Sequence, residues 1–284
     1  MPTLLTPPPT SVVPDLTTAD LTLIMSSAGK DSLGMLDLLA EHARDAGVLD
    51  RVTVVHNDLG TTDSGMPVEW PGTRELAAEQ AAFYGFRFEV TRRDLGGLFQ
   101  QIRAHGNFPS SNARFCTSDQ KTSQAMKLVT RLVAETGITD RPVRVFYCVG
   151  LRAEESPSRA SKPALAVDRR ASSGRRVVTR SHPILQWTEA QVWARIEESG
   201  APSHPAYSQG MGRLSCSFCP LAGKEDLIRA AQLRPDLAAE YLALEIELGV
   251  PFRRNFPMSQ IIAEAERRTA TALASVPAAS GAAQ

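Results

Sequence analysis

The sequence predicts an α/β fold with a largely parallel sheet in a Rossmann-like arrangement and a helical appendage towards the C-terminus. Short apolar runs, bounded by small or polar residues, recur as buried strands, and segments with helical periodicity follow them. A chain of 284 residues is long enough for one large domain with an appendage. Hydrophobic residues make up 43% of the chain and charged residues 22%, which is ordinary for a globular protein with a core.

The first predicted unit is a strand, a tight turn and a helix. An apolar run at residues 21–25 is typical of a buried strand, residues 26–29 are small, and leucines at helical spacing follow over residues 31–46. This geometry directs backbone N–H groups and the positive end of a helix towards an anion. The turn adds two hydroxyl groups and one cation, from Ser27, Ser32 and Lys30.

The turn differs from the common mononucleotide P-loop. That motif needs a glycine five residues before its Gly-Lys pair, and Ser or Thr directly after the lysine. Here Ile24 occupies the first position, and Asp31 separates Lys30 from Ser32. An ordinary strand-to-helix turn is the alternative interpretation of these residues.

The following elements repeat the pattern of strand and helix. Strands are predicted at residues 51–56, 86–90 and 144–150, and helices at 71–84 and from Ser118 or Asp119 to about residue 135. In a doubly wound sheet, the carboxyl ends of the strands form the ligand crevice.

Asp58 follows the second strand, at the edge where that crevice is expected. It is therefore a candidate for binding the nucleotide or its Mg²⁺, or else an aspartate that shapes a turn. Arg152 follows the fourth predicted strand and suits a phosphate or sulfate group.

Basic residues are concentrated in residues 152–180, where eight basic and three acidic side chains give a net charge of +5. Nearby glycine and serine residues predict a mobile loop or a hairpin. The segment is either a solvated arm, or a lid that closes over an anionic ligand or contacts a nucleic acid. The whole chain has a formal net charge of zero, so any polyanion site must be a local patch.

The C-terminal part is predicted to be mostly helical. An extended segment at 182–187 precedes a helix that Thr188 caps, and helices are expected at 224–233, 236–248 and 259–273. The expected organisation is a tail at 1–17, a nucleotide-binding domain at 18–225, a helical appendage at 226–273 and a tail at 274–284. No apolar run approaches membrane length, so we expect no membrane partner.

The four cysteines occur without a secretory signal, which favours a reducing, cytoplasmic location and a metal or redox role. Cys116 is expected in a loop just before a helix, near Arg114 and Lys121, which favours a thiolate; a buried spectator is the alternative. Cys148 lies in a predicted strand and is most simply a core residue.

Cys216 and Cys219 form a Cys-x-x-Cys pair. The pair is a metal site or a redox pair, or the spacing occurs by chance. No second such pair completes a zinc ribbon. With Cys116, three thiolates can converge, which suits a 4Fe-4S cluster with an open position for exogenous sulfur. A Zn²⁺ site with a fourth ligand is the competing interpretation.

Five blocks in this order resemble the phosphoadenosine phosphosulfate (PAPS) reductase family, within the PP-loop adenine-nucleotide α-hydrolase-like superfamily. The blocks are Ser27–Ser32, Arg114–Thr117 with Lys121, Gly150–Ser156, Pro183–Thr188 and Cys216–Pro220. Ala28 replaces the first glycine of the family's Ser-Gly-Gly-Lys-Asp-Ser loop, so this turn position must tolerate a Cβ. No cysteine follows Cys219, whereas thioredoxin-dependent reductases carry one in a Glu-Cys-Gly motif. The cysteine layout is therefore more similar to that of members that thiolate nucleic acids.

The resemblance implies an ATP pyrophosphatase that adenylates an acceptor and transfers sulfur to it. The acceptor would be DNA, tRNA or a small molecule, Mg²⁺ would assist, and a donor protein or a small thiol or sulfide would supply sulfur. The alternatives are a phosphoadenylyl- or adenylyl-sulfate reductase and a non-catalytic nucleotide-binding module. The implied catalytic residues are Lys30, Asp31, Cys116 and Arg152. The implied ATP- or PAPS-binding residues are Ser26, Ser27, Ala28, Gly29, Lys30, Asp31, Ser32, Asp58, Gly150 and Arg152. The implied metal ligands are Cys116, Cys216 and Cys219.

Overall fold

The computed structural model describes residues 11–274 and contains a six-stranded sheet with the order β3-β2-β1-β4-β6-β5. All neighbouring strands are parallel except β5, which runs antiparallel to β6. The predicted α/β class with a largely parallel sheet is therefore confirmed. The strands are Leu21–Ser26 (β1), Val52–Asp58 (β2), Arg87–Arg92 (β3), Val143–Val149 (β4), Leu165–Val167 (β5) and Arg176–Ser181 (β6).

The chain divides into two compact units that interleave along the sequence. Unit 1 comprises residues 1–58, 71–94 and 116–205, and unit 2 comprises residues 59–70, 95–115 and 206–284. This division differs from the expected boundary at residue 225. The Cys216–Cys219 segment and two excursions from the sheet, at residues 59–70 and 95–115, belong to unit 2 with the C-terminal helices.

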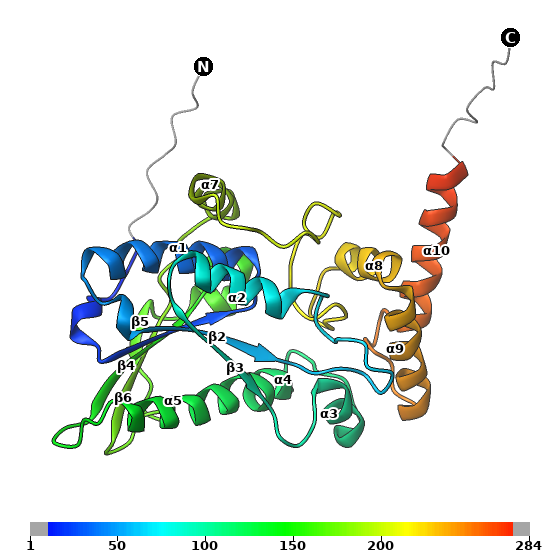
Figure 1. The fold of residues 1–284 in the computed structure, drawn as a ribbon. Coiled ribbons are helices and arrows are strands. Elements are labelled where there is room, and N and C mark those ends of the chain that lie inside the picture. Colours follow the sequence, from blue (N-terminus) through cyan, green and yellow to red (C-terminus); the bar gives the residue numbers. More distant parts are fainter. Residues whose placement is uncertain (1–10, 275–284) are drawn as a thin grey trace, which may run out of the picture. The chain divides into compact units, whose positions relative to one another are not determined.

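Unit 1 contains the sheet and the helices that cover it (Figure 1). Helices α1, α2 and α7 lie on one face and α5 on the other. Their bounds are Lys30–Asp45 (α1), Thr73–Phe83 (α2), Ser123–Glu135 (α5) and Glu189–Ser199 (α7), and a short helix, Pro157–Ala160 (α6), precedes β5.

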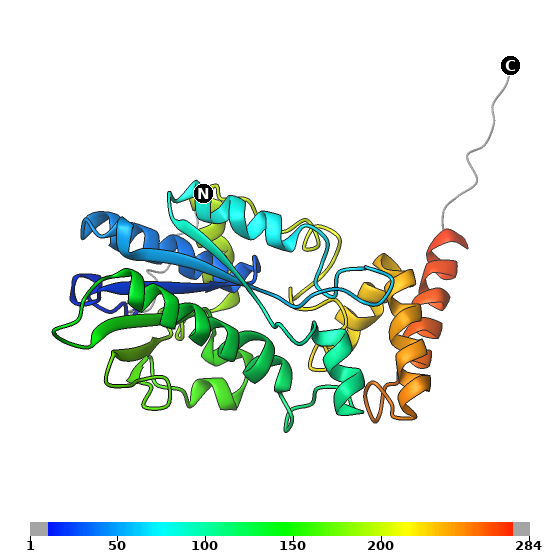
Figure 2. The same ribbon diagram turned by 60° about the horizontal axis from the view of Figure 1, so that its bottom comes forward.

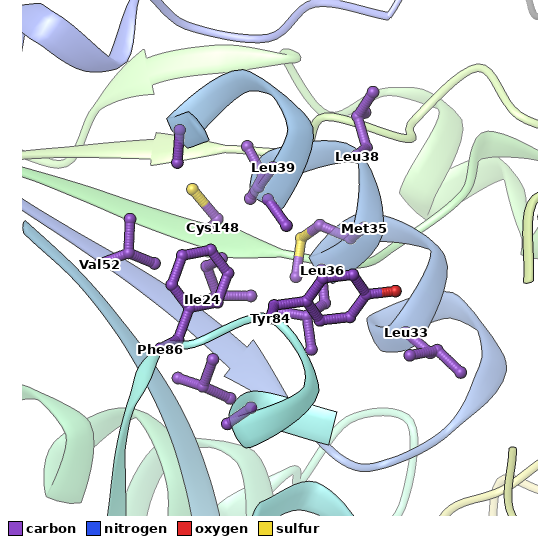
Figure 3. Packing of buried hydrophobic residues seen from close by; sticks show 14 of the residues in the cluster. Ile24, Leu33, Met35, Leu36, Leu38, Leu39, Val52, Tyr84, Phe86 and Cys148 are labelled. Carbon is purple, nitrogen blue, oxygen red and sulfur yellow. The ribbon is translucent and has the colours of Figure 1, made fainter. Parts of the chain in front are cut away.

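The central strand β1 is buried on both faces, which explains its continuous apolar run. Ile24 packs with Leu36 and Cys148 beneath α1, as Figure 3 shows, whereas Leu23 faces the cluster beneath α5. The two clusters hold β1 rigidly, and they therefore hold the loop at its carboxyl end.

Unit 2 is mainly helical, and its helices α8, α9 and α10 pack against one another (Figure 2). The helices are Leu98–His105 (α3), Lys224–Leu233 (α8), Pro235–Leu248 (α9) and Met258–Ala274 (α10). The predicted bounds of the three C-terminal helices are confirmed to within one residue at each end. No helix within residues 11–274 is both long enough and apolar enough to cross a membrane.

The helix that carries Cys116 begins earlier than predicted. A short helix, Phe115–Thr117 (α4), leads into a π-helical turn at Ser118–Thr122 and then into α5. Cys116 therefore lies in a helical turn and not in a preceding loop. Ser118 and Asp119, the predicted caps, are inside the helical run.

Part of the expected N-terminal tail is packed on unit 1. The Trp187 indole N–H donates to Ser11 Oγ over 2.8 Å, Asp15 caps a short 3-10 helix, and Leu16 is buried. These contacts keep residues 11–17 against the core, so this part is no tail. Residues 1–10 of that expected tail, and residues 275–284 of the other, lie outside the described residues.

Two further segments can be compared with their predictions from the sequence. The basic segment forms a hairpin from β5 and β6, which confirms the hairpin alternative. The segment at 182–187 is a pair of turns instead of an extended strand, because Leu185 N–H and Trp187 N–H donate to His182 and Ile184 carbonyls. The predicted capping box of Thr188 and Gln191 at the start of α7 is present.

Candidate active site

The loop between β1 and α1 lies at the carboxyl end of the central strand. Gly29 occupies the N-cap of α1 and has no side chain to accept from the amides of the first turn. Ala28 has a φ of 55°, and among residues 11–274 it is the single non-glycine residue with a positive φ. The alanine at this turn thus adopts the left-handed conformation that a glycine adopts readily, at a cost of roughly 1 kcal/mol.

Hydroxyl groups fix the shape of this loop. The Ser32 hydroxyl donates to the Gly29 carbonyl over 2.8 Å and accepts from the Ser27 N–H over 3.3 Å. The Ser26 hydroxyl accepts from the Ala28 N–H over 3.1 Å. The loop is therefore pre-formed by its own side chains, which is what a phosphate-binding turn requires.

Two basic side chains are buried beside the loop, Lys30 and Arg152, each only 3% exposed. Asp31 lies between them: its carboxylate accepts from Arg152 Nε over 2.6 Å and is 3.7 Å from Lys30 Nζ. Arg152 also forms an ion pair with Glu154. We call Lys30 and Arg152 the cation pair. Because burial strips water from both groups, their charges act strongly on a nearby anion.

Glu189, the first residue of α7, contacts both members of the cation pair. Its carboxylate oxygens lie 3.6 Å from Lys30 Nζ and 3.6 Å from Arg152 Nη2. Sequence reasoning identified the capping box around Glu189 and not its role in the site. Glu189 directly follows the family-like block Pro183–Thr188, but the sequence carries no local signal for its contact with the cations.

Gly150 allows β4 to approach the start of α1. A Cβ built on Gly150 would lie 2.6 Å from the Asp31 carbonyl oxygen and 3.1 Å from the Ser32 backbone nitrogen. Any side chain at this position would therefore displace the loop. The absence of a side chain at Gly150 lets the backbones of β4 and α1 lie close together, and this places Arg152 next to Asp31.

Two further buried residues support the loop, and sequence reasoning missed both. His56 Nδ1 lies 3.2 Å from the Ser26 carbonyl oxygen. Gln80 Nε2 donates to the Pro202 carbonyl over 2.8 Å and lies 3.5 Å from the Ala28 carbonyl oxygen. The predicted ligand-side residue Asp58 ends β2, in register with Arg92 of β3.

The Cys216–Cys219 segment of unit 2 is anchored by the residues between the cysteines. Phe218 is buried against Tyr241, with ring centroids 5.3 Å apart. Arg234 donates to Ser217 Oγ over 2.6 Å, and Cys216 forms a β-bridge with Glu69. Both cysteines are half-buried at the ends of this anchored turn.

Cys116 belongs to unit 1, whereas Cys216 and Cys219 belong to unit 2. The predicted three-thiolate site therefore stays a prediction. Within residues 11–274, no three His, Cys, Asp or Glu side chains are arranged as a metal site, and no disulfide joins the cysteines.

Residues 22–222 match the family model of the phosphoadenosine phosphosulfate reductase domain. The chain belongs to this family. An uncharacterized 37.8 kDa protein of Escherichia phage 186 is 30% identical over 167 residues, which are 57% of this chain and 48% of the relative. An adenosine 5'-phosphosulfate reductase of Allochromatium vinosum is 36% identical over 76 residues, which are 27% of this chain and 28% of that relative. The chain thus spans about half, or less, of the length of these curated relatives.

Solved structures of similar fold include two proteins of nucleotide and sulfur chemistry. A phosphoadenylyl-sulfate reductase from Candida auris is 20% identical with a TM-score of 0.43, covering 72% of this chain and 82% of that chain. A U34-tRNA thiolase from Methanococcus maripaludis, solved with its 4Fe-4S cluster, is 14% identical with a TM-score of 0.44. That match covers 91% of this chain and 74% of the thiolase chain.

Cys148 of this phosphoadenosine phosphosulfate reductase domain is fully buried in β4, which confirms it as a core residue. Burial raises the pKa of its thiol to about 12, so the thiol stays protonated at neutral pH. We expect iodoacetamide at pH 8 to label Cys116, Cys216 and Cys219 of chelator-treated native protein and to spare Cys148, as read by peptide mass spectrometry. In urea the Cys148 thiol returns to a pKa of about 8.5 and should react like the others. Native labelling of Cys148 at the rate of Cys216 would contradict its burial.

Phe218 is expected to hold the cysteine turn through the aromatic cluster of unit 2. Replacing Phe218 with alanine should lower the free energy of unfolding by roughly 3 kcal/mol, because it empties a buried ring site. The measurement is urea denaturation of the full chain. Ile246→Ala is the matched control, because Ile246 is 72% exposed in the same unit and should change stability little. Equal effects of the two substitutions would show that Phe218 is no anchor.

Proposed function

We propose that this chain is a PP-loop ATP pyrophosphatase that adenylates an acceptor and promotes transfer of sulfur to it. The observation that carries the proposal is the cation pair, buried beside a pre-formed loop at the N-terminus of α1. Membership of the phosphoadenosine phosphosulfate reductase domain family supports an adenine nucleotide as the ligand.

In the proposed reaction, Lys30 and the first-turn amides of α1 bind the β and γ phosphates, and Arg152 binds near the α phosphate. An acceptor oxygen attacks the α-phosphorus, the bond to the bridging oxygen breaks, and pyrophosphate leaves with that electron pair. Asp31 orients both cations through its contacts with them. Catalysis is mainly positioning and charge stabilisation.

Mg²⁺ and a sulfur-binding metal group are the implied cofactors. Asp58, at the carboxyl end of β2, offers the oxygen ligand that Mg²⁺ takes, and a bound Mg²⁺ would neutralise charge on pyrophosphate. Cys216 and Cys219 fit part of a thiolate donor set for a 4Fe-4S cluster or Zn²⁺, with Cys116 as the proposed third ligand. In the second half-reaction, hydrosulfide attacks the acceptor atom that bears the adenylated oxygen, the bond between that atom and the oxygen breaks, and AMP leaves with the oxygen and its electron pair while the hydrosulfide proton is released to solvent.

The test is a product assay with the full chain, ATP, Mg²⁺, hydrosulfide and either tRNA or duplex DNA. We expect equimolar AMP and pyrophosphate in the presence of the acceptor. Sulfite release from adenylyl sulfate or its 3'-phosphate with a thiol reductant would instead support the reductase alternative, which the relative from Allochromatium vinosum favours. Nucleotide binding without either product would indicate a non-catalytic module. Anaerobic iron, sulfide and zinc analysis of wild-type and Cys116→Ser protein tests the three-thiolate site.

The basic segment of residues 159–180, which contains the β5–β6 hairpin, is the proposed contact for a nucleic-acid acceptor. Arg159 pairs with Glu155 and Arg180 with Asp168, so these charges are partly neutralised. Four other basic residues are exposed and make no ion pair with the described part of the chain: Lys162, Arg169, Arg170 and Arg175. Such side chains can contact phosphates of a nucleic-acid backbone.

Replacing Arg169 and Arg170 together with alanine is expected to weaken binding of tRNA or duplex DNA about tenfold. The slope of log affinity against log salt should fall by about 1–2, because phosphate contacts are lost. Electrophoretic or fluorescence titration at several salt concentrations measures both. The control, Arg267→Ala with Arg268→Ala, removes the same charge from residues paired with Glu264. Equal losses from both double variants would exclude a specific role of the hairpin.

A further inference from the structure

Glu189 is one of two described carboxylates, with Asp31, that contact both cations of the proposed phosphate site. Its two oxygens divide between them, one 3.6 Å from Lys30 Nζ and the other 3.6 Å from Arg152 Nη2. A carboxylate held in this way spans the two cations as two oxygens of a phosphoryl group would. Glu189 therefore occupies the position that an anionic ligand needs.

The three carboxylates around the cation pair are held to different degrees. Asp31 accepts a direct hydrogen bond from Arg152 and is 19% exposed, and Glu154 forms a direct ion pair with Arg152. The contacts of Glu189 are longer than a hydrogen bond, and its side chain is 48% exposed. Of the three, Glu189 is the one that a ligand can displace at the smallest cost.

The local structure also allows the Glu189 side chain to move away from the cations. The residue is the first of α7, directly after the Thr188 cap, and its own N–H donates to Glu154 over 2.8 Å. A carboxylate in the first turn of a helix is stabilised by the helix dipole, which does not require contact with the cations. Rotation about its side-chain bonds can therefore release the cations without moving α7.

We propose that Glu189 is a built-in competitor of phosphoryl binding, which shields Lys30 and Arg152 until a polyphosphate displaces it. The inference rests on the proposed function, because it needs the cation pair to bind phosphoryl groups. It adds selectivity to that site. A ligand with several negative charges can replace both contacts of Glu189, whereas a weakly charged anion cannot.

The test measures binding of inorganic pyrophosphate to the full chain by calorimetry, with a chelator present. Glu189→Gln keeps the shape and removes the charge, and we expect about tenfold tighter binding because two charge contacts no longer compete. Glu189→Ala should act in the same direction. Glu198→Gln, on an exposed position of the same helix, is the control and should match the wild type.

The sign of the change separates competition from a structural role. Glu189→Gln should also melt earlier than the wild type without ligand and gain more stability from pyrophosphate, because a buried cation pair has lost a counter-charge. Equal or weaker pyrophosphate binding by both Glu189 variants, with normal binding by the wild type, overturns the inference and leaves the proposed function intact. If neither the wild type nor the variants bind pyrophosphate or ATP, the proposed function fails and the inference falls with it.

Discussion

Replacing Lys30 with alanine is expected to lower the rate of pyrophosphate release from ATP about 100-fold, because one preorganised charge contact to the leaving group is lost. The Lys30 ammonium is buried beside the loop, where water cannot replace it. The measurement is AMP and pyrophosphate production by wild-type and variant protein under saturating acceptor.

The matched control for this substitution is Lys127→Ala. Lys127 is an exposed lysine of unit 1 that pairs with Asp94 on the surface. It should keep the wild-type rate, because an exposed ion pair contributes little. If Lys30→Ala protein is folded and still releases pyrophosphate at the wild-type rate, Lys30 is not a catalytic residue.

Replacing Gly150 with alanine is expected to have the second large effect. The new Cβ would lie 2.6 Å from the Asp31 carbonyl oxygen, so β4 and the start of α1 must move apart. The clash is with backbone, which cannot rotate away, and should cost roughly 1–3 kcal/mol of folding free energy. The shift also separates Arg152 from Asp31, so nucleotide affinity should fall. Urea denaturation and ATP titration measure the two effects.

Gly174→Ala is the control for the glycine prediction. Gly174 belongs to the same unit and has open space around its Cβ position. The alanine should leave both stability and ATP affinity close to those of the wild type. If Gly150→Ala matched Gly174→Ala in both measurements, the close approach between β4 and α1 would be required neither for stability nor for nucleotide binding.

Local patterns were sufficient to predict the first four strands of the sheet and the loop, but not that β6 joins the sheet beside β4. The apolar run at β1 is continuous because the strand is buried on both faces, and the small residues after it favour a turn. Lys30 and Arg152 follow strands that are adjacent in the sheet, so topology alone brings them to one edge. Ala28 was expected to tolerate a Cβ, and it does so with a positive φ.

Features that depend on contacts distant in sequence were not predictable. Glu189 reaches Lys30 and Arg152 because α7 packs on α1, and no local pattern around residue 189 encodes that contact. The two excursions at residues 59–70 and 95–115 join the C-terminal helices in unit 2, which a linear division of the chain could not reveal. The early start of the helix at Phe115 involves a π-helical turn, for which the sequence offers no clear signal.

The central claim is that residues 26–32, with Lys30 and Arg152, bind the phosphoryl groups of an adenine nucleotide. Hydrogen exchange of the full chain, followed by mass spectrometry with and without saturating ATP and Mg²⁺, tests it most directly. We predict slower exchange in peptides that cover residues 26–33 and 150–153, and no such change in Lys30→Ala protein. ATP that binds while exchange in both peptides stays unchanged, or slows only elsewhere, would contradict the claim.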